Sequence, residues 1–79
     1  MAKSSAYFLV DNAGDKHTSK AIKENVGKLH GVISVSIADD GETVAVDYDT
    51  TGVTTDRIEK QFENLGLSSQ LKTVDEHIM

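Results

Sequence analysis

The two halves of the chain repeat the same spacing of apolar residues, and this repeat constrains the fold more than any other feature. In each half three apolar residues fall at i, i+4 and i+7, and a shift of 36 residues superposes the two sets. The sets are Ile22, Val26 and Leu29, and Ile58, Phe62 and Leu65. This spacing is typical of the buried face of an α-helix. It predicts one amphipathic helix over residues 18–29 and a second that begins at Thr54 or Thr55 and ends at Gly66.

Four segments rich in strand-forming residues flank the two predicted helices. They cover residues 7–10, 32–37, 43–49 and 67–74. In the second segment the alternation of side chains predicts Ile33, Val35 and Ile37 as the buried face. Residues 39–42 form a predicted hairpin turn, in which Gly41 is free to adopt a positive φ.

The order strand, helix, strand, strand, helix, strand predicts an α+β fold of the ferredoxin-like type. Two βαβ units with right-handed crossovers interleave into one four-stranded antiparallel sheet, and both helices cover the same face. We expect the 79 residues to form a single domain, with a core over residues 6–74. Residues 75–79 have no apolar pattern and are expected to be a flexible tail.

The composition excludes several classes of function. The net charge of −5 argues against nucleic acid as a partner, and no apolar run approaches the roughly 20 residues of a membrane span. The apolar run at residues 6–10 is too short for a secretion signal, and cysteine is absent, so we expect a cytoplasmic protein. No arrangement of nucleophile, acid and base suggests an enzyme. The charge is uneven, because residues 1–33 hold five lysines against three acids, whereas residues 34–79 hold ten acids against three basic residues.

Several short segments together resemble the heavy-metal-associated domain family. They are Gly31 and Val32 with Ser34 and Val35, residues 44–49, Val53 with Thr54, and residues 58–66. The resemblance runs from about Phe8 to Leu71. This family includes copper chaperones, mercury-binding proteins and the N-terminal repeats of copper- and zinc-transporting P-type ATPases. The resemblance implies a small non-catalytic domain that works in metal ion binding, transport or handling.

The motif that binds the metal in this family is missing. The family carries Gly-Met-Thr-Cys-x-x-Cys in its first loop, with an isoleucine four residues beyond the second cysteine. Counting back from Ile22 places the two cysteine positions on Asp15 and Thr18. The Gly, Met and Thr positions fall on Asn12, Ala13 and Gly14. Without a thiolate the loop lacks the ligand that Cu(I) prefers.

Two interpretations of this loop remain open. Asp15 and Thr18 can serve as capping residues, because Asp and Thr side chains accept hydrogen bonds from the free N–H groups at a helix start. Alternatively Asp11, Asp15 and His17 form a weak site for a divalent ion such as Zn(II), Ni(II) or Cu(II). The thiolate site is then either lost or replaced by a weak Asp/His site.

A second candidate site is a row of lysines on the first helix. Lys16, Lys20 and Lys23 follow i, i+4 and i+7 on its outer side. The resemblance implies that such a surface docks on an acidic protein domain, for example a module of a metal transporter. The alternative function is a metal-independent interaction or regulatory module that docks through the same face. Asp56, Glu59 and Glu63 form an acidic row on the second helix, so weak self-association is also expected.

Overall fold

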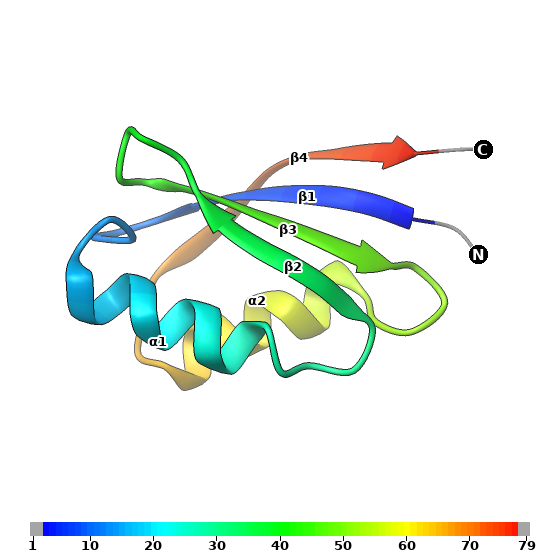
Figure 1. Ribbon diagram of the computed structural model, residues 1–79, viewed down its shortest axis with the longest axis horizontal. Helices are drawn as coiled ribbons and strands as arrows, with labels where there is room; N and C mark the ends of the chain where they lie inside the picture. Colours follow the sequence, from blue (N-terminus) through cyan, green and yellow to red (C-terminus); the bar gives the residue numbers. More distant parts are fainter. Residues whose placement is uncertain (1–2, 78–79) are drawn as a thin grey trace.

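A computed structural model describes residues 3–77 as one four-stranded sheet with two helices against it (Figure 1). The elements are β1 (Lys3–Val10), α1 (Lys16–Val26), β2 (Val32–Ile37), β3 (Thr43–Asp49), α2 (Thr55–Asn64) and β4 (Ser69–His77). The strands lie in the order β2-β3-β1-β4, and every neighbouring pair is antiparallel. The ferredoxin-like βαββαβ fold predicted from the sequence is therefore confirmed.

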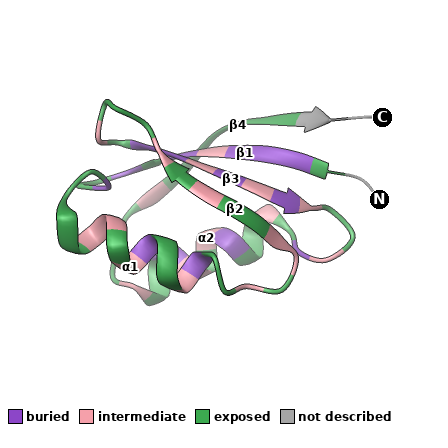
Figure 2. Cartoon of the chain, in the orientation of Figure 1, coloured by how far each residue is buried: buried purple, intermediate pink, exposed green. Residues whose placement is uncertain are grey.

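The core lies between the sheet and the two helices, as the apolar repeat predicts. Ile22 and Val26 of α1 and Ile58 and Phe62 of α2 are fully buried. The ring of Phe62 packs against that of Phe8 in β1, with 5.3 Å between the centroids and a tilt of 58°. Figure 2 shows that the buried residues of the sheet are concentrated in its two central strands, β1 and β3, and that each helix contributes further buried residues.

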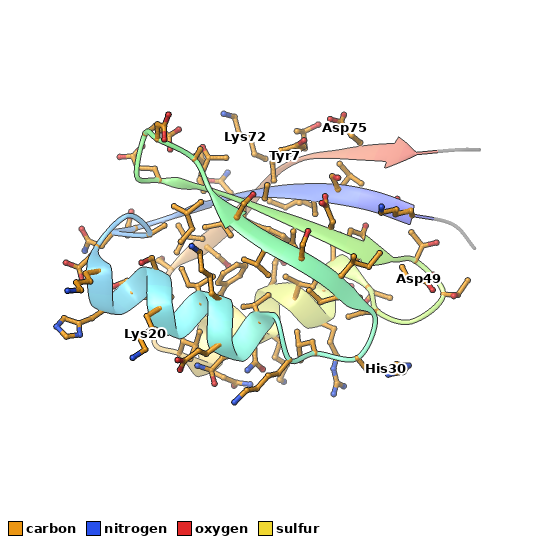
Figure 3. The ribbon with its side chains drawn as sticks, in the orientation of Figure 1. Tyr7, Lys20, His30, Asp49, Lys72 and Asp75 are labelled. Atoms are coloured by element: carbon orange, nitrogen blue, oxygen red, sulfur yellow. The ribbon has the colours of Figure 1, made fainter. Side chains whose placement is uncertain are left out.

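The opposite face of the sheet has no helix over it. Figure 3 places Tyr7, Lys72 and Asp75 on this open face. Asp47 of β3 joins two neighbouring strands there, because its carboxylate accepts hydrogen bonds from the hydroxyls of Ser5 in β1 and Ser34 in β2. The serines and aspartates at alternate strand positions thus form a polar surface. No helix within residues 3–77 is long and apolar enough to cross a membrane.

The predicted burial of Ile33 is wrong. The side chain of Ile33 is 56% exposed, whereas Val32, Val35 and Ile37 pack against the core. The reason is a register irregularity between Val32 and Ser34, where β2 has one more residue than its partner β3. An extra residue reverses the alternation of side chains on one side of it, so Val32 takes the inward position and Ile33 is turned outward.

The bounds of several elements also differ from the sequence prediction, and β1 begins at Lys3 instead of Tyr7. The first helix covers Lys16–Val26, so it starts and ends earlier than the predicted residues 18–29. The last strand begins at Ser69 and continues to His77, into the segment predicted to be a flexible tail. Residues 75–77 are held there because β4 pairs with the first residues of β1, including Lys3 with His77. The rest of the predicted tail, residues 78–79, lies outside the described residues.

Candidate functional site

The loop that joins β1 to α1 is tightly folded. Asn12 has a φ of 60°, and the amide of Asp15 donates to the carbonyl oxygen of Asn12 at 3.0 Å. Ala13, at the position of the family's methionine, is fully buried. The amide of Ala13 in turn donates to the carbonyl oxygen of Val10 at 3.3 Å. Both ends of the loop are therefore fixed before α1 begins.

Asp15 caps the first helix. Its Oδ2 accepts hydrogen bonds from the backbone amides of His17 at 3.2 Å and Thr18 at 3.4 Å. Its φ of −64° and ψ of 141° are the extended values typical of a capping residue. The capping interpretation is thus confirmed for Asp15. It is wrong for Thr18, which lies within the first turn of α1 and supplies an amide to the cap.

The loop is attached to the β2–β3 hairpin through two glycines. The amide of Gly14 donates to the carbonyl oxygen of Gly41 at 2.8 Å. A Cβ atom on Gly14 would lie only 2.7 Å from Cα of Gly41, closer than side-chain atoms approach in folded proteins. Gly41 itself has the positive φ, 72°, that the sequence predicts for this turn. Because Gly14 occupies the family's threonine position, this contact holds only while that side chain is absent.

Asp40 stabilises the hairpin turn. Its carboxylate accepts hydrogen bonds at 2.8 Å from the amides of Glu42 and Thr43 and from the hydroxyl of Thr43. These hydrogen bonds lower the pKa of Asp40, because they stabilise its ionised carboxylate. The bond from the amide of Glu42 has the largest effect. An ionised carboxylate therefore holds the turn that touches the loop at neutral pH.

The three candidate metal ligands have separate environments. Asp11, Asp15 and His17 are all exposed. Among the side chains that the structure describes, no group of three or more His, Asp or Glu residues is placed so that it could hold a metal ion. The carboxylate of Asp15 is already engaged by two amides of α1. The structure therefore does not bring these three residues together, and metal binding by them stays a prediction.

A shallow hollow of about 490 Å³ lies beside the loop, and the sequence did not predict it. It is open to solvent, and the acids Asp11 and Glu42 line it with Ser68, Ser69 and Gln70. The amide of Val10 donates to the carbonyl oxygen of Glu42 at 2.8 Å, which brings the hairpin to this point. Residues from three separate segments meet here through strand register alone, so no local motif could have indicated them.

The candidate docking residues Lys16, Lys20 and Lys23 are all exposed on α1. Figure 3 shows Lys20 projecting from α1 away from the sheet. The helix thus presents the row of charges that the sequence predicts.

Comparison with known protein families decides the classification of the chain. A profile of the heavy-metal-associated domain, HMA, matches residues 7–68. The chain belongs to the HMA domain family. No curated protein sequence matches it. The matched range contains the second half of β1, the loop, both helices, β2 and β3, so membership rests on most of the scaffold.

Solved structures of similar architecture agree with membership of the HMA family. The apo copper chaperone of Enterococcus hirae is 25% identical, with a TM-score of 0.75 over 85% of this chain and 98% of that one. The Cu(I)-loaded N-terminal domain of a potential copper-translocating P-type ATPase from Bacillus subtilis is 21% identical, with a TM-score of 0.81 over 98% and 94%. Oxidized MerP from Ralstonia metallidurans CH34 is 17% identical, with a TM-score of 0.80 over 90% and 99%.

The residues of this HMA domain do not fit a soft metal ion. Cu(I) prefers thiolate and thioether ligands, and the chain contains no cysteine. At the two cysteine positions of the HMA motif stand Asp15, which caps α1, and Thr18, whose amide the cap engages. Oxygen and imidazole ligands suit harder divalent ions, and the described residues do not assemble three of them. The HMA scaffold is present in this chain without the donor set of the HMA motif.

Proposed function

We propose that this HMA domain is a non-catalytic module of cytoplasmic metal handling whose loop has lost its thiolate metal site. The observation that carries the proposal is the cap formed by Asp15. A carboxylate that accepts two helix amides stabilises the start of α1, and this role replaces ligation at the first cysteine position. Any remaining affinity of Asp11, Asp15 and His17 for Zn(II), Ni(II) or Cu(II) is weak.

The proposed partner is an acidic protein domain, such as a module of a metal transporter. Lys16, Lys20 and Lys23 are exposed on one helix and follow one another at helical spacing. Such a row raises the rate of encounter with an acidic surface, more than it raises the affinity. The proposal is supported by the occurrence of the same fold in the N-terminal domain of a potential copper-translocating P-type ATPase from Bacillus subtilis.

Titration followed by backbone amide shifts tests the metal part of the proposal. Zn(II), Ni(II), Cu(II) and Cu(I) are added in turn to the native chain and to an Asp15→Asn variant, which keeps a capping side chain without the charge. With the divalent ions we expect small amide shifts near residues 11–18, and these shifts should not saturate at micromolar concentrations of the ion. With Cu(I) we expect no shifts. A saturable stoichiometric change confined to these residues in the native chain would show that a metal site persists and that the proposal is wrong.

A further inference from the structure

Each helix carries its charged row on the side that faces away from the other helix. Consecutive residues of a helix are about 100° apart, so Lys23 and Asn25 lie about 80° to either side of the buried pair Ile22 and Val26. In α2 the equivalent positions, 36 residues on, are Glu59 and Gln61. Gln61 is on the flank next to α1, because its Nε2 reaches the carbonyl oxygen of Asn25 at 3.5 Å. The flanks with Lys23 and Glu59 therefore face outward on opposite sides of the domain.

These flanks lie beside the two edge strands of the sheet. The strand order places β2 at one edge and β4 at the other. Figure 1 shows α1 with β2 on the near side of the molecule and α2 with β4 on the far side. We call Lys16, Lys20, Lys23 and Ile33 the basic edge. We call Asp56, Glu59, Glu63, Leu71 and Val74 the acidic edge.

Both edges expose apolar side chains next to their charges. Ile33 on the basic edge is 56% exposed. On the acidic edge Leu71 and Val74 are 36% and 37% exposed, although they pair with the buried residues Phe8 and Ala6. They face the helix side of the sheet at its margin, where the helices do not cover them. Each edge therefore has apolar surface that a contact with another protein would remove from water.

The strand directions at the two edges match as well. β1 is antiparallel to both β3 and β4, and β3 is antiparallel to β2, so β2 and β4 run in opposite directions. A copy displaced sideways would therefore bring its β2 alongside β4 as an antiparallel neighbour, with its α1 next to α2. Val35 shares a row of the sheet with Val46, Ala6 and Val74, so Val35 of the copy is level with Val74, and the exposed Ile33 lies two residues before it in β2.

Both edge strands carry an irregularity that limits such a contact. The register shifts between Val32 and Ser34 in β2, and between Tyr7 and Phe8 where β1 meets β4, next to Lys72. Irregularities of this kind interrupt the free backbone groups of an edge and prevent extended strand pairing. A contact between the edges therefore depends mainly on the side chains, and it is weak and reversible.

We infer that each edge also binds a second copy of this chain, joined head-to-tail with the basic edge of one copy against the acidic edge of the next, so that at the basic edge the copy competes with the acidic domain proposed above. The charges and the strand directions of the two edges are complementary, and each edge has exposed apolar surface beside its charges. The contact is heterologous, so a third copy can add in the same way. The two edges lie outside the loop of residues 11–15. A test of this contact is therefore independent of whether the loop binds a metal ion.

The salt dependence of self-association provides the first test. The net charge of −5 makes two chains repel each other over long distances, whereas the charges of facing edges attract over short ones. At about 0.1 M salt the Debye length is about 10 Å, so facing charges attract while the remote excess of acids is largely screened. At about 1 M the length falls to about 3 Å and the local attraction is lost as well. Sedimentation velocity should show a mass that grows with protein concentration at the lower salt and stays monomeric at the higher salt.

Charge reversal provides the decisive test. The variant Lys20→Glu/Lys23→Glu has two acidic edges, and the variant Glu59→Lys/Glu63→Lys has two basic edges. Each alone should remain monomeric, whereas an equimolar mixture should regain an association at least as strong as that of the native chain. The variant Lys3→Glu/Lys28→Glu has the same net charge as the first but changes two exposed lysines outside both edges, and it should associate like the native chain.

Each outcome has a defined meaning. Recovery in the mixture, together with weaker association of Ile33→Ser at unchanged secondary structure, supports the inference. If the native chain stays monomeric up to millimolar concentration at about 0.1 M salt, the inference is wrong. A mixture that associates no more than its separate components would also overturn the inference, and the acidic domain proposed above would then be the one proposed partner of the basic edge.

Discussion

The side chain of Asp15 accepts a hydrogen bond from the amide of Thr18, with Oδ2 3.4 Å from the nitrogen. These two residues occupy the positions of the two cysteines in the HMA motif. In a metal-binding loop the two side chains would converge on an ion, whereas here one side chain serves the backbone of the other. At the first cysteine position of the motif, the side chain therefore stabilises a helix start.

Replacing the cap should lower stability. Asp15→Ala leaves the amides of His17 and Thr18 without their acceptor, and we expect the free energy of unfolding to fall by about 0.5–2 kcal/mol. Asp15→Ser keeps a capping oxygen and should lose only a small part of this. Urea unfolding of the three proteins measures the difference. Equal stability of the alanine variant and the native chain would show that the cap does not stabilise α1.

A side chain at position 14 should separate the loop from the hairpin. The Cβ of Gly14→Ala would lie 2.7 Å from Cα of Gly41, and neither backbone can yield as a flexible side chain would. We expect a loss of about 1–3 kcal/mol, typical of overpacking. Gly66→Ala is the comparison, because it meets nothing within 4 Å and is strained only by its φ of 76°. The amide shifts of Gly41 and Glu42 should move in the first variant and not in the second.

The hairpin turn should weaken in acid. The pKa of Asp40 is lowered in the folded chain, so its contribution is present above the ordinary pKa of an aspartate and is lost as pH falls through the lower folded value. The carboxyl shift of Asp40 should titrate below the usual aspartate range, and Asp40→Asn should reduce the acid dependence of stability. An unshifted midpoint for Asp40 would contradict the role given to its hydrogen bonds with Glu42 and Thr43.

The exposure of Ile33 gives a direct comparison between two isoleucines. Ile33→Ala removes a side chain that is 56% exposed, and its effect should stay within about 0.5 kcal/mol. Ile22→Ala empties a fully buried position between α1 and the sheet and should cost about 2–5 kcal/mol. Thermal or urea unfolding distinguishes the two. A large loss at Ile33 would mean that the alternation read from the sequence is correct and that β2 has no extra residue.

The fold was predictable because its determinants are local and repeated. The spacing of Ile22 and Val26 returns at Ile58 and Phe62, and all four residues are buried as predicted. The alternation of side chains in β2 predicted a buried Ile33, and this prediction was wrong. The register irregularity between β2 and β3 leaves no pattern in the local sequence. The extension of β4 to His77 depends on its pairing with Lys3, at the other end of the chain.

The candidate site was only partly predictable, for a related reason. Asp15 could be assigned to a cap from its place before a helix. The contact between Gly14 and Gly41 and the hollow beside Glu42 could not be predicted, since they arise where three separate segments meet. The sequence thus indicated that the loop lacks thiolate ligands. The contact with the hairpin that positions the loop could be seen only in the tertiary structure.

Competition for Cu(I) with a strong chelator tests most directly whether the thiolate site has been lost. The native chain, the variant Asp15→Cys/Thr18→Cys and the thiol-free control Asp15→Ser/Thr18→Ser are loaded with Cu(I), dialysed against the chelator and analysed for bound copper. We expect the native chain and the control to lose all copper, and the cysteine variant to retain about one ion per chain, because two thiolates on this scaffold supply the missing ligands. Stoichiometric Cu(I) retained by the native chain would contradict the account.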